Sequence, residues 1–241
     1  MSSTFFAGLR DALVGAHRAA RPSPARQKVA TEDLINELAA SLRPSAEPRF
    51  RARLALGAGM GAVASALFVN LVVGFRPDLA AASTTAVFWV KLAYPIAVCA
   101  LALWCVERLS QPGGDDGPRR RWLVAPILAL GAAALWRLSQ TPVNLVPAAV
   151  MGASAGQCPW LIALASLPPL AGLLWAIGGQ APTRLAATGV MLGVAAGGAG
   201  ATAYALHCGE SSLPFLAIWY TLGISAVGLI GGMLGRPLLR W

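Results

Sequence analysis

Charged residues are scarce in this sequence, and they are confined to a few places. Only 12% of the 241 residues are charged and 56% are hydrophobic, whereas about a quarter of the residues in a soluble domain are charged. The stretch 122–235 holds only Arg137, Arg184 and Glu210, while residues 1–53 hold nine of the 19 Lys and Arg. This scarcity excludes a soluble core and predicts an all-α, polytopic membrane helix bundle behind a basic N-terminal tail.

Residue types that carry chemistry are also rare. The four cysteines and two histidines form no CxxC or HxxxH cluster, which argues against a closed structural zinc site, and no cofactor is expected. Nucleotide-binding loops and HExxH or GxSxG signatures are absent. Apart from Lys91 and Arg137, the apolar segments contain no Lys, Arg, Asp or Glu, although ion-coupled transporters usually need acidic or basic groups at mid-membrane. An enzyme is therefore not expected, and a small membrane transporter or metal-export component is the second choice.

Long apolar segments, by contrast, are plentiful. About 20 residues are needed to span a typical hydrocarbon core, and the third segment is shorter than that. Pairs of tryptophans bracket the second, third and fourth segments at intervals of 14 or 15 residues, roughly 21–22 Å along a helix. This interval matches two aromatic belts at the membrane surfaces. The six predicted transmembrane helices are 54–74, 86–106, 122–138, 160–178, 185–207 and 213–234.

The positive charges predict the orientation of these helices. Residues 1–53 carry nine Lys and Arg, the segment 107–121 carries four, and Arg184, Arg236 and Arg240 follow in alternate loops. The opposite loops carry only Arg76 and Arg137. This bias favours cytoplasmic N- and C-termini in a multi-pass membrane protein. Lys91, near the outer end of the second span, is expected to snorkel to the surface. The net charge of +9 indicates contact with anionic membrane lipid rather than direct binding of nucleic acid.

The tail divides into two parts ahead of the transmembrane domain 54–241. Residues 1–28 form a basic extension, with an over-long start of the sequence as the alternative, and residues 29–53 form a cytoplasmic segment. A short helix over 31–42 is predicted within it, because Thr31 is a good N-cap and Glu32 and Asp33 suit the first turn. Such a short helix needs a surface to dock on, either a protein partner or the membrane and its own bundle. The expected contact stripe is Leu34, Ile35, Leu38 and Leu42.

Glycines and prolines indicate how the spans pack. Glycines recur at four-residue intervals in the first, fifth and sixth spans, which allows close approach of helices in lipid. A tight bundle is the expected outcome, and a glycine-lined substrate path is the alternative. Pro168 and Pro169 should kink the fourth span. The glycine pairs are Gly57/Gly61, Gly189/Gly193/Gly197, Gly228/Gly232 and Gly231/Gly235.

Two cysteines are the candidate reactive groups. With cytoplasmic termini, Cys158 precedes the fourth span and Cys208 follows the fifth on the same outer face, where thiols can pair or bind a soft metal. Reversible thiol sensing, a structural disulfide and two unrelated thiols all remain open. His207 is a candidate third ligand or a structural residue. Cys99 and Cys105, inside the second span, are expected to be apolar filler.

Several strings of residues resemble a known family. They are Gly74–Leu79, Phe88–Leu92, Cys158-Pro159, Ala181–Arg184, Ala203–Cys208, Trp219–Gly223 and Arg240-Trp241, together with the segment Thr31–Leu42. Over about 31–241 the chain resembles the NrsF family of six-pass inner-membrane anti-sigma factors. The resemblance implies that the cytoplasmic N-terminal segment holds an ECF sigma factor of the sigma-F type. It also implies that the two outer cysteines take part in sensing heavy-metal or oxidative stress.

Overall fold

The computed structural model describes residues 32–37, 40, 47–111 and 113–240. Residues up to Ala46 and residues from Glu47 onward form separate units, so each is treated by itself. In the first unit, residues 32–37 are helical and exposed. Thr31, Leu38, Leu42 and the extension 1–28 lie outside the described residues.

The second unit is a bundle of helices with no strand among its described residues. Six helices or helix pairs in the described part of the chain are long and apolar enough to cross a membrane, as predicted. The tryptophans of the predicted belts, 89, 104, 122, 136, 160 and 175, are all exposed. The elements are α3 (Glu47–Val72), α4 (Leu79–Ala82), α5 (Ala86–Leu109), α6 (Gly117–Arg120), η1 (Arg121–Leu123), α7 (Val124–Ser139), η2 (Val143–Leu145), α8 (Val146–Met151), α9 (Cys158–Ala165), α10 (Leu167–Ile177), α11 (Leu185–Ala205), α12 (Leu213–Phe215), the π-helical η3 (Leu216–Tyr220) and α13 (Thr221–Leu238).

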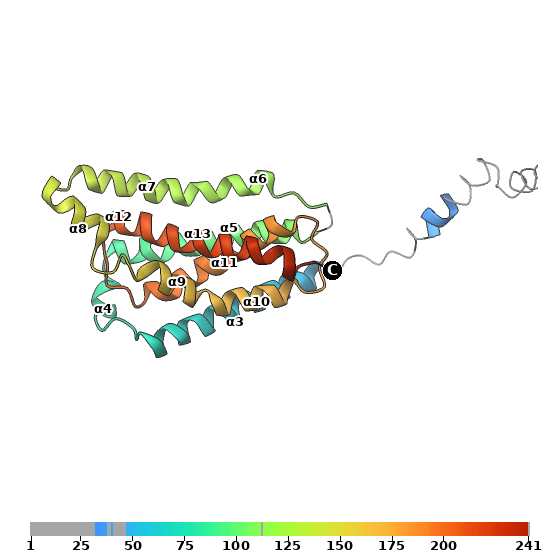
Figure 1. Cartoon of the computed structure of the whole chain (residues 1–241), viewed down its shortest axis with the longest axis horizontal. Helices are drawn as coiled ribbons and strands as arrows, with labels where there is room; N and C mark the ends of the chain where they lie inside the picture. Colours follow the sequence, from blue (N-terminus) through green and yellow to red (C-terminus); the bar gives the residue numbers. More distant parts are fainter. Residues whose placement is uncertain (1–31, 38–39, 41–46, 112, 241) are drawn as a thin grey trace, which may run out of the picture. The chain divides into compact units, whose positions relative to one another are not determined.

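The helices run back and forth between two ends of the bundle (Figure 1). One end, which we call the thiol end, holds the connections 73–85, 140–157 and 206–212, with α4 and α8. The other, the arginine end, holds the start of α3, the connections 110–116 and 178–184, and the C-terminal residues. The predicted loop order is therefore confirmed, because alternate loops share an end.

Two span boundaries differ from those predicted. The first helix begins at Glu47 rather than near residue 54, because Arg51 pairs with Glu107 and Arg53 donates to the Trp175 carbonyl oxygen at 3.2 Å. These contacts extend helical structure beyond the apolar residues. The third span is longer than expected, since α6 and η1 continue into α7 and give 23 residues, Gly117–Ser139.

The fourth span is broken where the two prolines predicted a kink. Its two pieces, α9 and α10, meet at Ser166. Proline lacks an amide hydrogen and cannot continue the helical ladder. The Ser166 hydroxyl donates to the Ile162 carbonyl oxygen at 2.6 Å. The break turns α10 against α3, where a Cβ on Gly61 would overlap the Pro169 backbone.

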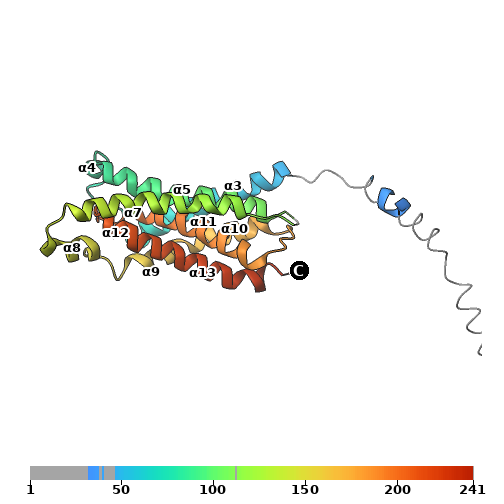
Figure 2. The same cartoon turned by 90° about the horizontal axis from the view of Figure 1, so that it is seen from above.

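Helix α11 is the centre of the bundle. It packs against α13, α5, α10, α3 and α9, and two perpendicular views show it among these helices (Figures 1 and 2). Its closest neighbour is α13: a Cβ on Gly193 would lie 2.9 Å from the Gly228 Cα, and one on Gly189 would lie 2.8 Å from the Gly235 Cα. The glycine repeats thus bring two backbones into contact, which confirms the predicted close approach.

This contact predicts a large cost for a single methyl group. Gly193→Ala forces the new Cβ into the α13 backbone, so we expect it to lower the free energy of unfolding by about 1–3 kcal/mol. The matched control is Gly59→Ala in α3, where the new Cβ meets nothing within 4 Å. Thermal unfolding of the detergent-solubilised proteins measures the difference, and equal melting temperatures would contradict the close contact.

Candidate functional site

Cys158 and Cys208 lie in one buried cluster at the thiol end. Cys158 is the first residue of α9, and Cys208 follows the last turn of α11 with its amide donating to the Tyr204 carbonyl oxygen at 3.0 Å. Their exposures are 0% and 3%. Both side chains belong to one buried core cluster that also contains Tyr204. The structure therefore brings together the two residues that topology had placed on one face. All four cysteines are free thiols.

Two tyrosines complete this cluster, and the sequence had not singled them out as site residues. Tyr204 and Tyr220 have ring centroids 6.0 Å apart. Tyr220 is fully buried near Cys208. Its hydroxyl has no hydrogen-bond partner among the described residues. We call Cys158, Cys208, Tyr204 and Tyr220 the thiol cluster.

Lys91 does not snorkel, contrary to the prediction. Its side chain is 2% exposed, and its Nζ donates to the carbonyl oxygens of Cys208 at 2.6 Å and Glu210 at 2.9 Å. These residues follow the end of α11, where carbonyl groups lack helical partners. Among the described residues, no carboxylate forms an ion pair with Lys91. Backbone dipoles and the Tyr220 ring, 5.9 Å from Nζ, surround the charge instead.

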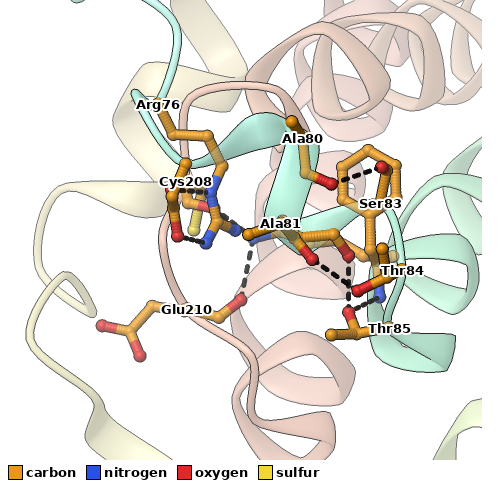
Figure 3. Close-up of polar contacts among 12 residues, drawn as sticks. Arg76, Ala80, Ala81, Ser83, Thr84, Thr85, Cys208 and Glu210 are labelled. Carbon is orange, nitrogen blue, oxygen red and sulfur yellow. Dashed lines mark hydrogen bonds and ion pairs between the residues drawn. The ribbon is translucent and has the colours of Figure 1, made fainter.

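Arg76 holds the same segment from the first connection (Figure 3). Its amide donates to the Leu206 carbonyl oxygen at 3.2 Å, and its Nη1 approaches the Cys208 carbonyl oxygen at 3.5 Å. The guanidinium is itself fixed by Asp78, with Nε–Oδ1 and Nη2–Oδ2 distances of 2.7 and 2.6 Å. A pocket of about 240 Å³ lies beside Lys91 and Arg76 and is also lined by Thr85 and Ser211.

The Arg76–Asp78 pair responds to acid in a defined direction. The hydrogen bonds from Arg76 hold the pKa of the Asp78 carboxyl below its usual value, and the pKa of Arg76 is raised in return. A carboxylate with a lowered folded-state pKa contributes stability above its unfolded pKa, and this contribution is lost as the pH falls through the folded value. Protonation of Asp78 at low pH therefore weakens the contacts that fix the Arg76 guanidinium.

His207 faces the first connection rather than a group of metal ligands. Its Nδ1 lies 2.7 Å from the Gly74 carbonyl oxygen, which can only accept, so Nδ1 carries the proton and Nε2 keeps a lone pair in the neutral ring. Gly74, two residues after the end of α3, has a φ of 78°, a conformation that suits glycine. Among the described residues, no three His, Cys, Asp or Glu side chains are placed together to hold a metal ion.

The remaining connection at this end joins the same network. The Glu210 carboxylate accepts from the Ala153 amide at 2.7 Å, and the Ser212 hydroxyl donates to the Ala149 carbonyl oxygen at 2.5 Å. The segment 206–212, which we call the Cys208 loop, is thus held by both other connections of the thiol end and by Lys91. A chemical change at Cys208 would therefore disturb the contacts of the loop with both connections and with Lys91.

The other candidate residues lie elsewhere. Cys99 is half-buried and Cys105 is buried, both in α5. Leu34 and Ile35, in the first unit, are 55% and 51% exposed. These two apolar side chains are adjacent in sequence and exposed, so a partner could contact both. Leu38 and Leu42 lie outside the described residues.

Comparison with known proteins identifies the family. The sequence model of the family described as NrsF, negative regulator of sigma F, matches residues 38–241. The chain is 42% identical over 214 residues to the anti-sigma-F factor NrsF of Caulobacter vibrioides, covering 88% of this chain and 99% of that protein. It is 35% identical over 211 residues to the probable anti-sigma-F factor NrsF of Azospira oryzae, with the same coverage. No solved structure matches it. The chain belongs to the NrsF family.

Proposed function

We propose that this protein is an inner-membrane anti-sigma factor that holds an ECF sigma factor of the sigma-F type at the cytoplasmic face. The observation that carries the proposal is the match to relatives named anti-sigma-F factors along 99% of their length. Regulators of this kind act by binding, so no enzymatic activity is proposed. The six apolar helices support insertion in the membrane.

The distribution of arginines supports cytoplasmic termini. Arg51, Arg119, Arg184 and Arg236 belong to elements that meet at the arginine end, whereas the thiol end has Arg76 and Arg137. Basic residues are retained on the cytoplasmic side of a membrane. The arginine end is therefore the proposed cytoplasmic face, and the thiol cluster then faces the periplasm.

Sigma-factor binding is proposed for the N-terminal helix. Leu34 and Ile35 are exposed on a helical segment, and with Leu38 and Leu42 they form the apolar stripe expected of a helix that docks in a groove. The family match begins at residue 38, so Leu34 and Ile35 are assigned on this pattern alone.

Release is proposed to follow a reaction of Cys158 and Cys208 with a metal or an oxidant. The support is the burial of the two thiols in one core cluster. Because the thiols are buried, a reagent reaches them only when the Cys208 loop opens. The free energy of loop opening thus determines how readily the protein responds to a metal or an oxidant.

The docking helix is tested by charge substitution. Leu34→Asp and Leu38→Asp should each weaken binding of the sigma factor at least tenfold, about 1.4 kcal/mol, because an unpaired carboxylate would have to be buried in the groove. The matched control is Asn36→Asp, which adds the same charge on the polar side of the helix. Co-purification of the sigma factor with each variant at equal abundance gives the answer. Undiminished binding by both leucine variants would contradict the proposed contact.

A further inference from the structure

A second hollow lies at the arginine end, between the first turn of α11 and the last turn of α13. Its volume is about 820 Å³. One wall is apolar, with Leu185, Ala186, Ala187 and Pro237, and the rim carries Arg184, Arg236 and Arg240. None of its lining residues belongs to the thiol cluster.

The glycine contact between these helices explains the hollow. A Cβ on Gly235 would lie 3.1 Å from the Gly189 Cα, so the backbones touch one turn inside this end. Small side chains follow, since Ala186 and Ala187 occupy the first turn of α11. The space beside the crossing is left open because no large side chain fills it.

The charge of the hollow is unbalanced. Arg236 and Arg240 are exposed, and no ion pair or hydrogen bond of their side chains is found among the described residues. Arg184 Nη1 lies 2.7 Å from Asp115 Oδ1, with both side chains more than half exposed, and such an exposed pair contributes little. In addition, no side chain caps the start of α11, so its first amides also lack acceptors.

We propose that this hollow binds the phosphate group of an anionic phospholipid. Guanidinium groups recognise phosphate by paired, charge-assisted hydrogen bonds. The apolar wall formed by Leu185–Ala187 and Pro237 receives the glycerol and the first acyl carbons. Basic pockets between helices on the cytoplasmic side suit lipid headgroups. A soluble phosphate ion would use the arginines but not the apolar wall.

The site rests on the membrane insertion proposed above, and on no part of the sigma-factor contact. The hollow lies where two of the candidate spans end, at the depth of headgroups in an inserted bundle. An acidic protein segment is the competing ligand, but the hollow combines its charges with an apolar wall at the hydrocarbon boundary. That combination favours a lipid.

The test is lipid binding to the full-length, delipidated protein in detergent, followed by native mass spectrometry. Phosphatidylglycerol should bind at least tenfold more tightly than phosphatidylethanolamine with the same acyl chains. The double variant Arg236→Gln/Arg240→Gln should lose this preference with an unchanged melting temperature. The control is Arg137→Gln, which removes an exposed arginine from the last turn of α7 at the thiol end and should keep it.

Four results would overturn the site. They are equal binding of the two lipids, an equal loss in the Arg137 variant, displacement of phosphatidylglycerol by millimolar inorganic phosphate, and displacement by a hexaglutamate peptide. The latter two would assign the hollow to a soluble anion or an acidic segment. Membrane fractionation separates this outcome from failure of the proposed function: a protein found in the membrane that does not select anionic lipid disproves the lipid site alone.

Discussion

Replacing Lys91 with methionine should release the Cys208 loop and expose its thiol. Methionine keeps the apolar stem but cannot donate to the Cys208 and Glu210 carbonyl oxygens, which accept from Nζ at 2.6 and 2.9 Å. Hydrogen bonds to a charged group contribute about 1.5–3 kcal/mol each, and removing a buried, unpaired charge offsets part of that loss. A net change of about 2 kcal/mol in the free energy of loop opening corresponds to roughly thirtyfold more open loop.

Labelling of Cys208 by a membrane-impermeant maleimide measures this opening, in a protein whose other three cysteines are serine. The Lys91→Met variant should label roughly thirtyfold faster, in keeping with the change in opening free energy. Arg137→Met, at the same end but exposed, is the control and should label as the parent does. Unchanged labelling of the Lys91 variant would mean that Arg76 and the helix end hold the loop without it.

The hydrogen-bond partners of Lys91 could not be predicted from the sequence. A lone lysine one turn inside an apolar span is visible in the sequence, and ionisable residues within spans tend to be functional. Snorkelling was the simpler interpretation because the acceptors were unknown. They are backbone carbonyls 117 and 119 residues away, and only the packing of α5 against α11 brings them to Nζ.

The spans themselves were predictable because each depends on a local signal. Apolar length, the tryptophan intervals and the Pro168-Pro169 pair gave six helices and the break at Ser166. The start of α3 was not predictable, since the Arg51–Glu107 pair and the bond from Arg53 to Trp175 join residues far apart in sequence. The two cysteines were placed on one face by topology, but their burial depends on Tyr204 and Tyr220, whose packing no local pattern reveals.

Burial constrains how the proposed cysteine sensor would react. A thiol at 0% or 3% exposure does not meet a reagent directly, and buried cysteines are ordinarily inert. The Cys208 loop, however, is held by hydrogen bonds rather than by a helix, so the proposed sensing depends on its opening.

Cys158→Ser and Cys208→Ser should therefore each abolish the response to a thiol-binding metal such as Cd²⁺ and to diamide, and the double variant should be no worse than either. Residues that act as one unit show such non-additivity. Induction of a sigma-dependent reporter should fall at least tenfold in all three variants at equal protein abundance. Abundance must be checked, because a serine hydroxyl buried without a partner costs about 1–3 kcal/mol. Cys99→Ser and Cys105→Ser should induce normally.

The outcomes separate the three interpretations of the cysteines. If both single variants and the double variant fail to induce the reporter, the two cysteines act as a paired sensor. Constitutive induction in the single variants would identify a bridge that holds the repressing state, as a structural disulfide would. Normal induction in both would show that the thiols are unrelated to sensing, and their shared burial would then be packing alone. Lys91 and Arg76 hold the Cys208 loop under all three interpretations. The double variant Lys91→Met/Cys158→Ser therefore adds a further measurement. If the cysteines act as a paired sensor, opening the loop should not restore induction when one thiol is missing.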